Sequence, residues 1–376
     1  MAAIQVSRAL ATWIHDFSDI WLESMVHHWW HGLDLGFYSF GLAHDSRCRL
    51  LLLGSRPKKV RSFFNLAFLN VSGGSIFSGT QNLADRKLTK QWFFWGYSLA
   101  FSKTANKFIG NLDNFGFRGV LAQKSGNVPD LLFAIFQCMF AAITPALAIG
   151  AAAERGRMLP CIVFIFVWAT IVYDPIACWT WNANGWVYQL GGLDFAGGTP
   201  VHISSGAAAL AYSVMLGKRR GHGTHELNYR PHNVSHVILG TVFLWFGWFG
   251  FNGGSALGSN LRATMACVVT NLAASVGGFT WVLVDYRLER KWSAVGWCSG
   301  AIAGLVAITP ASGYVPPWSA VVFGVVGAIA CNYATKLKFL IGVDDALDIF
   351  AVHGIGGIVG NLLTYAPILM TEKTND

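Results

Sequence analysis

Residues 193–203 read LDFAGGTPVHI and lead into an apolar segment that carries His202 near its start. A second histidine, His353, lies 151 residues later in the stretch DDALDIFAVHG, residues 344–354, again near the start of an apolar segment. Of the 11 histidines, only these two fall well inside apolar runs. An ionisable side chain at membrane depth is costly and usually faces a cavity or a pathway. The two stretches therefore predict a membrane protein with a pair of histidines in its interior.

The composition of the whole chain agrees with this prediction. The 376 residues are 53% hydrophobic and 12% charged, about half the charge of an ordinary soluble domain. Eight runs are long and apolar enough to be candidate spanning helices. They cover approximately residues 130–152, 159–180, 199–216, 233–252, 263–284, 294–310, 318–335 and 347–366, and the aromatic run 91–102 resembles half of another. We expect an all-α polytopic membrane protein.

The distribution of basic residues predicts the orientation of these helices. The net charge of +8 comes from 27 Lys and Arg against 19 Asp and Glu. The connections at 154–157, 217–232, 287–292 and 336–344 hold eleven Lys or Arg, whereas those at 181–198, 253–262 and 311–317 hold only Arg262. Basic loops of membrane proteins face the cytoplasm. The first set is therefore predicted to be cytoplasmic, and the charge indicates a bilayer rather than nucleic acid as the partner.

Two short matches indicate an internal repeat. The sequence ITPA at 143–146 recurs at 308–311, and each histidine of the pair begins an apolar segment. Each match lies five predicted helices apart, and an odd number inverts the topology of the second copy. Inverted repeats of transporters place their sites near the bilayer midplane. We therefore expect His202 and His353 to occupy related positions in two halves of opposite orientation.

The cysteines and the N-terminus give no sign of metal, cofactor or signal peptide. None of the seven Cys forms a CxxC pair, and no spacing matches a zinc site. Acids and scattered His replace the basic stretch and apolar run of a cleaved signal near the N-terminus. No cofactor, bound metal or cleaved signal is expected.

The residues that carry chemistry each have a structural alternative. His202 and His353 as a pair suit a weak base or proton conduction, because neutral imidazoles share a proton and still offer outward-facing nitrogens, whereas a lone His often only bonds a carbonyl. Asp194, in the Gly-rich stretch before His202, either attracts a cation or caps the helix.

Aromatic residues form the third group of candidates. Phe136 and Phe140 lie four residues apart, Trp181 ends its helix, and Phe251 precedes Ser255 by one turn. Most membrane aromatics are interfacial or packing residues. A few rings around a small cation, with a hydroxyl beside them, instead form a cation–π site.

Several stretches together carry a family resemblance. They are FAAITPA at 140–146, GAAAERGR at 150–157, LDFAGGTPVHI at 193–203, PHN at 231–233, GWFGFNGGS at 247–255, SGAIAGLVAIT at 299–309 and DDALDIFAVHG at 344–354. This wording resembles the ammonium transporter family (the Amt/Mep/Rh group), and within it the fungal methylammonium-permease branch. The resemblance spans residues from about 91 to 363.

The resemblance implies a fold and a set of roles. It implies a plasma-membrane, multi-pass homotrimer, a transporter rather than an enzyme, with eleven helices per subunit in an inverted five-plus-five repeat. Trp181, Phe140 and Ser255 match the ammonium-recruitment site; Phe140 with Phe251 matches the gate, with Phe136 beside it. His202 and His353 match the twin lumen histidines where ammonium is deprotonated, and Asp194 matches the supporting aspartate.

The ends of the chain depart from the family pattern. Residues 1–90 do not match it, so we distinguish this region from a transmembrane domain at 91–366 and a short polar tail at 367–376. The family's first and last helices are accordingly expected to be degraded or missing. Either the gene sequence has been read with an error, or the chain is a truncated paralogue. A truncated paralogue favours the alternative function, a transport-inactive ammonium sensor or dominant-negative subunit.

Three other functions can be compared with transport on these residues. His202 belongs to the pattern of family members associated with ammonium sensing as well as uptake. A membrane metalloprotein using His202, His353 and Asp194 is disfavoured, since neither histidine has a metal-ligand spacing. A neutral-gas channel is disfavoured by Trp181 and Ser255, which suit a cation.

Overall fold

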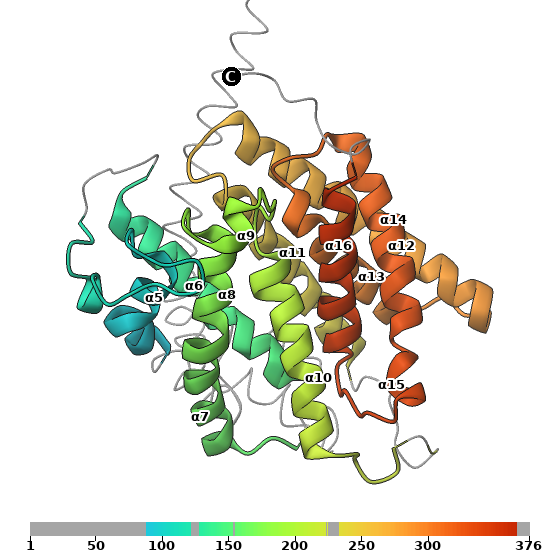
Figure 1. Ribbon diagram of the computed structural model, residues 1–376. Coiled ribbons are helices and arrows are strands. Elements are labelled where there is room, and N and C mark those ends of the chain that lie inside the picture. Colours follow the sequence, from blue (N-terminus) through green and yellow to red (C-terminus); the bar gives the residue numbers. More distant parts are fainter. Residues whose placement is uncertain (1–87, 122–127, 153–154, 223, 225–232, 367–376) are drawn as a thin grey trace, which may run out of the picture.

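The computed structural model describes residues 88–121, 128–152, 155–222, 224 and 233–366, and every regular element within these ranges is helical (Figure 1). The α-helices are α5 (Tyr97–Phe101), α6 (Asp130–Gly150), α7 (Met158–Trp168), α8 (Asp174–Trp181), α9 (Trp186–Gln189), α10 (Ser204–Leu216), α11 (Val234–Gly254), α12 (Leu261–Glu289), α13 (Ala294–Ile308), α14 (Pro317–Ala334), α15 (Leu337–Leu340) and α16 (Gly356–Thr364). The 3₁₀ turns are η2 (Phe115–Phe117) and η5 (Thr309–Ala311). The π-helical turns are η1 (Trp92–Gly96), η3 (Ala169–Tyr173), η4 (Gly198–Ile203) and η6 (Phe350–Ile355).

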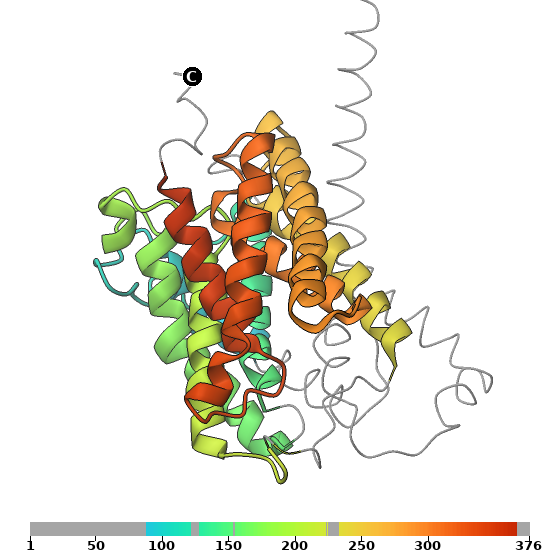
Figure 2. The ribbon, with the colours of Figure 1, turned by 90° about the vertical axis from the view of Figure 1, so that its right-hand side faces the viewer.

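The helices stand side by side as one bundle (Figures 1 and 2). Six are long and apolar enough to cross a membrane: Asp130–Gly150, Leu159–Gln189, Val234–Gly254, Leu261–Glu289, Ala294–Ala311 and Pro317–Leu340. Large apolar side chains on the outside of the bundle, among them Leu159, Ile171, Phe279 and Leu362, are more than half exposed. Such a surface suits contact with lipid. The predicted all-α polytopic architecture is confirmed.

The other two predicted segments, 199–216 and 347–366, correspond to η4 with α10 and to η6 with α16. Both histidine-bearing helices therefore begin with a π-helical turn, a feature often found at functional sites. The predicted half-helix at 91–102 corresponds to η1 and α5. The predicted atypical region up to residue 87 and the tail at 367–376 lie outside the described residues.

One helix extends further than its apolar run predicts. Helix α12 continues from the predicted end at residue 284 to Glu289, so Arg287 lies in its last turn rather than in a loop. It ends where Arg290 adopts a left-handed conformation with φ of 57°. Polar residues occur both in loops and in helix ends that extend into water. Hydrophobicity alone therefore underestimated the length of α12.

Small residues allow the helices of the core to approach closely. A Cβ on Gly300 would lie 2.4 Å from the Gly277 carbonyl oxygen, and one on Gly304 would lie 2.2 Å from that of Ala273. These contacts join α12 to α13. On the two histidine-bearing helices, a Cβ on Gly206 would lie 2.3 Å from both Cα and N of Gly354. Backbones can approach this closely only where side chains are absent.

Two amide–carboxylate hydrogen bonds also join helices inside the bundle. Gln91 Nε2 donates to Asp174 Oδ2 over 2.7 Å, which ties the segment before η1 to α8. Asn332 Nδ2 donates to Asp285 Oδ1 over 2.9 Å, which ties α14 to α12. A polar pair of this kind gives hydrogen-bond partners to side-chain groups that lipid cannot satisfy.

The contact between α10 and η6 gives a testable expectation. Gly206→Ala should destabilise the protein by about 1–3 kcal/mol, because its methyl group meets the backbone of Gly354 and forces the helices apart. Thermal unfolding in detergent, followed by tryptophan fluorescence, measures the effect. The control is Ala207→Val, which adds two methyl groups at the adjacent exposed position. Equal melting temperatures for the two variants would contradict the close contact.

Candidate functional site

The two histidines meet in the interior of the bundle. Their Nδ1 atoms lie 3.2 Å apart and their ring centroids 5.3 Å apart. His202 is 1% exposed and His353 is 2% exposed. At this distance one Nδ1 donates a proton and the other accepts it, so the two rings share one proton between them. His202 Nε2 has no hydrogen-bond partner among the described residues and remains available to a small molecule.

The local backbone explains why the two rings meet. His202 lies in η4 and His353 lies in η6, which pack against each other and against α10. Gly206 and Gly354 bring the backbones of the two helices together beside the rings. A Cβ on Gly357 would lie 3.0 Å from the His202 Cβ, so this position also requires a small residue.

Aromatic rings continue from the histidine pair. Phe251 lies 6.0 Å from the His202 ring, and Phe140 lies 4.5 Å from Phe251, centroid to centroid. Phe136 and Trp181 contact Phe140 edge-on, at 4.9 Å and 5.6 Å. The side chains come from α6, α8, α11 and η4, so residues distant in sequence form one row of rings.

Asp194 and Trp181 meet at the far end of this row. Trp181 Nε1 donates to the Asp194 carbonyl over 3.0 Å. The Asp194 carboxylate accepts from the backbone N–H groups of Gly197, Gly198 and Thr199 over 2.8, 2.7 and 2.6 Å. Burial raises the pKa of Asp194, while these three hydrogen bonds oppose the rise. The carboxylate therefore caps the first turn of η4, which is the structural one of the two roles considered for Asp194.

Ser255 completes the set of predicted residues. It lies one turn after Phe251, and its Oγ donates to the Phe251 carbonyl over 2.8 Å. All eight predicted residues therefore form one continuous chain of contacts. It runs from Asp194 through Trp181, Phe140 and Phe251 to His202 and His353, with Phe136 and Ser255 attached.

One further ring belongs to the site; the sequence offered it as a candidate aromatic residue but gave it no role. Trp248 stacks on His202 with centroids 5.4 Å apart and planes inclined by 16°. Its Nε1 donates to Thr309 Oγ1 over 2.9 Å, which fixes the indole. The available signal was its position three residues before Phe251, on the same helix face. Thr309 belongs to the second copy of the repeated ITPA sequence. This copy therefore helps to position the Trp248 ring in the site.

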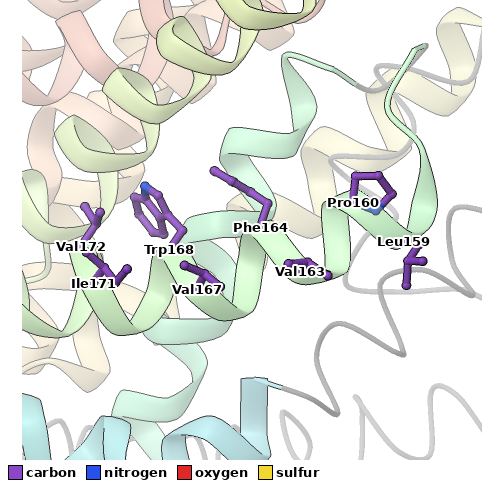
Figure 3. A pocket seen from close by; sticks show the side chains of 8 residues that line it. All are labelled: Leu159, Pro160, Val163, Phe164, Val167, Trp168, Ile171 and Val172. Atoms are coloured by element: carbon purple, nitrogen blue, oxygen red, sulfur yellow. The ribbon is translucent and has the colours of Figure 1, made fainter.

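A separate apolar groove lies on the outer face of α7 and η3 (Figure 3). Its volume is about 710 Å³, and its lining residues are Leu159, Pro160, Val163, Phe164, Val167, Trp168, Ile171 and Val172. None of these is a predicted site residue. Within the described ranges, no group of three or more His, Cys, Asp or Glu is placed to hold a metal ion.

Comparisons with known proteins agree on one family. A sequence model described as Ammonium Transporter Family matches residues 75–375. Ammonium transporter 1 of Schizosaccharomyces pombe is 67% identical over 277 residues, which are 73% of this chain and 55% of that protein. Ammonium transporter MEP2 of Saccharomyces cerevisiae is 57% identical over 281 residues, 73% of this chain and 56% of that protein. The chain thus spans about half the length of these relatives.

Solved structures share the fold. The crystal structure of Saccharomyces cerevisiae Mep2 superposes with a TM-score of 0.74 and 51% identity, covering 81% of this chain and 71% of that one. Candida albicans Mep2 gives a TM-score of 0.75 and 49% identity, covering 82% and 70%.

The cap at Asp194 gives a second testable expectation. Asp194→Ala removes the acceptor of three N–H groups and should cost about 1–2 kcal/mol of stability, while Asp194→Asn keeps a capping oxygen and should cost less. Thermal unfolding of the two variants measures the difference. Equal loss in both would mean that the charge, and not the cap, stabilises this turn.

Proposed function

Because the chain belongs to the Ammonium Transporter Family, we propose that it moves ammonium or ammonia across a membrane along the row of rings that ends at His202 and His353. The observation that carries the proposal is the 3.2 Å contact between the two imidazoles at the buried end of the aromatic row. An ordinary packing histidine has no need of a second imidazole partner.

Recruitment is the first step. Trp181 and Phe140 offer ring faces and edges at the end of the row, and Ser255 offers a hydroxyl oxygen beside Phe251. Ring faces attract a small cation, and a hydroxyl oxygen accepts a hydrogen bond from it. This combination favours ammonium over a neutral gas at the outer end.

The gate is the second step. Phe140 is 2% exposed and Phe251 is 8% exposed, and their rings are in contact. A hydrated cation cannot pass between touching rings, so ammonium must shed its water and the rings must move. Loss of water favours the neutral form, because a bare cation is expensive in apolar surroundings.

Deprotonation at the histidine pair is the third step. When His202 donates its Nδ1 proton to His353 Nδ1, the His202 Nε2 is an acceptor; this nitrogen takes a proton from ammonium, and neutral ammonia crosses the apolar interior. The proton remains on the pair until it leaves separately. Assembly as a homotrimer in the plasma membrane is part of the same proposal and follows from the family.

The histidine pair supplies the first test of transport. The full 376-residue chain should restore growth on low ammonium to a yeast that lacks its own ammonium transporters, and the double variant His202→Ala, His353→Ala should not. The control is His236→Ala, at the start of α11 and away from the row. Both variants must reach the membrane in equal amounts.

The outcomes of this growth experiment distinguish transport through the histidine pair from the transport-inactive alternative. Equal rescue by the double variant would exclude the histidine pathway. Absence of rescue by the unaltered chain, despite normal assembly, would instead favour the transport-inactive alternative.

The recruitment step supplies another test. Trp181→Leu should raise the half-saturating concentration of methylammonium about tenfold, since a cation–π contact in a partly desolvated site contributes roughly 1–2 kcal/mol. Uptake of labelled methylammonium measures it. The control is Trp186→Leu, an exposed tryptophan of α9. A lower maximal rate with unchanged half-saturation would contradict a role in recruitment.

A further inference from the structure

Each histidine of the pair is preceded by an aspartate at the same spacing. Asp194 lies eight residues before His202, and Asp345 lies eight residues before His353. Both carboxylates accept the backbone N–H five positions later: Asp194 Oδ2 from Thr199 over 2.6 Å and Asp345 Oδ2 from Phe350 over 2.8 Å. The repeat therefore includes a capping aspartate as well as the histidine.

Because the repeat is inverted, the two aspartates belong to opposite ends of the pathway. Asp194 lies beside Trp181, at the end predicted to be outside. Asp345 lies in the connection between α15 and η6, at the end predicted to be cytoplasmic, together with Arg155, Arg219 and Lys338.

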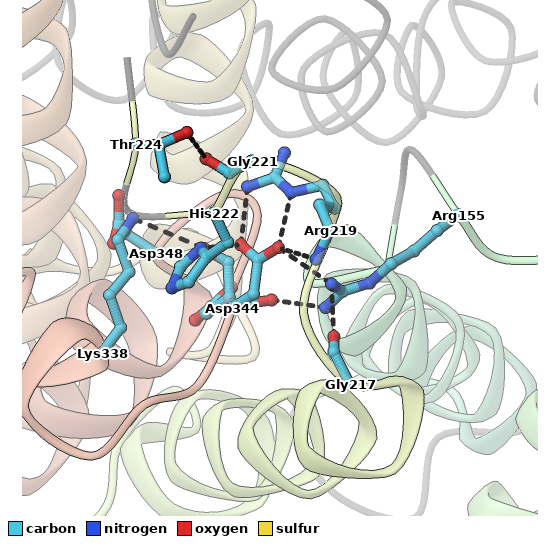
Figure 4. Close-up of polar contacts among 10 residues, drawn as sticks. Arg155, Gly217, Arg219, Gly221, His222, Thr224, Lys338, Asp344 and Asp348 are labelled. Atoms are coloured by element: carbon cyan, nitrogen blue, oxygen red, sulfur yellow. Dashed lines mark hydrogen bonds and ion pairs between the residues drawn. The ribbon is translucent and has the colours of Figure 1, made fainter. Parts of the chain in front are cut away.

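Two other aspartates share the loop with Asp345, and Asp344 is the first of them (Figure 4). Arg219 contacts it through Nη2, Nε and its backbone N over 2.7, 2.7 and 2.8 Å, and Arg155 Nη1 contacts it over 3.0 Å. His222 Nδ1 lies 3.2 Å from its Oδ1. Burial alone would raise the pKa of Asp344, but the hydrogen bonds and charges of the two arginines outweigh it and hold that pKa well below its usual value. Its carboxylate is fully engaged.

Asp348 is the second, and it is paired as well. Its Oδ1 lies 2.7 Å from Lys338 Nζ, which reaches across from α15 (Figure 4). Asp348 also adopts a left-handed conformation with φ of 55°, which turns the loop into η6. Neither Asp344 nor Asp348 therefore offers an unoccupied negative charge.

Asp345 differs from both. It is 3% exposed, its Oδ2 is used by the Phe350 cap, and its Oδ1 has no hydrogen-bond partner among the described residues. Burial, and then the charge of Asp348, raise the pKa of Asp345 to about 6. Besides Asp348, the charged groups that act on Asp345 are Lys338 from α15 and Arg155, which follows α6. Arg219 and His222 instead contact the neighbouring Asp344.

We propose that Asp345 is the anionic group of an inner binding position for ammonium or methylammonium, the counterpart of Asp194 at the outer end of the pathway. The inference rests on the proposed transport function. Oδ1 accepts a hydrogen bond from the cation, while Oδ2 continues to cap η6. A buried carboxylate oxygen without a donor is costly, and a small cation with several N–H donors satisfies it.

The proposal predicts an effect that depends on the side of the membrane. Labelled methylammonium transport is measured in right-side-out and inside-out membrane vesicles containing the full chain. Asp345→Asn keeps a capping oxygen but removes the charge. It should raise the half-saturating methylammonium concentration at the cytoplasmic face at least about tenfold, as expected for loss of a charged hydrogen bond. The half-saturating concentration at the outer face should stay unchanged. Asp194→Asn, the matched control at the other end of the repeat, should give the opposite pattern.

The pH dependence supplies a second prediction. In the unaltered chain, affinity at the cytoplasmic face should fall as the pH on that side drops below about 6, because protonation neutralises Asp345. Asp345→Asn should lack this step. Equal effects of Asp345→Asn on both faces, or none on either, would overturn the proposal.

A binding measurement separates this inference from transport itself. In detergent, methylammonium should slow hydrogen exchange in the peptide 344–353 of the unaltered chain and not in Asp345→Asn. Slowed exchange in a chain that transports nothing would count against the proposed function only. Unchanged exchange in the unaltered chain would overturn the inner position even if transport is observed.

Discussion

The close approach of Gly206 to Gly354 is the constraint on which the rest of the site depends. Two helices from opposite halves of the chain meet here without side chains between them, and the imidazoles beside the contact are held 3.2 Å apart. The aromatic row is then positioned by its contact with His202. In lipid, where water supplies no hydrophobic force between helices, close packing of small residues is the main source of such precision.

The inverted repeat gives the site its two ends. Each half supplies an aspartate, a π-helical turn and a histidine at the same spacing, and the aspartate fixes the N-terminal turn of the helix that carries the histidine. The halves differ in what surrounds the aspartate. Asp194 is next to an indole, whereas Asp345 is next to carboxylates and basic side chains. A symmetric backbone therefore carries chemically different ends.

Much of this arrangement follows from the sequence. Apolar runs predicted the spanning helices, and the family resemblance predicted the eight residues that lie in contact. Trp248 was a candidate aromatic residue without an assigned role, because stacking between η4 and α11 depends on tertiary packing rather than spacing. The π-helical turns were also missed, since hydrophobic periodicity does not distinguish them from α-helix over five or six residues. The match between Asp194 and Asp345 became clear only when both were seen to cap a helix.

The bond between Gln91 and Asp174 has a consequence for how the chain is made. A carboxyl group in the middle of an apolar helix opposes its transfer from the translocon into lipid, and its amide partner lies 83 residues earlier in the chain. The earlier segment is synthesised first, so the Gln91 amide is available when the later helix emerges. We expect the later helix to enter the lipid while its Asp174 carboxyl group contacts the Gln91 amide. The order of synthesis would then determine which helices become neighbours.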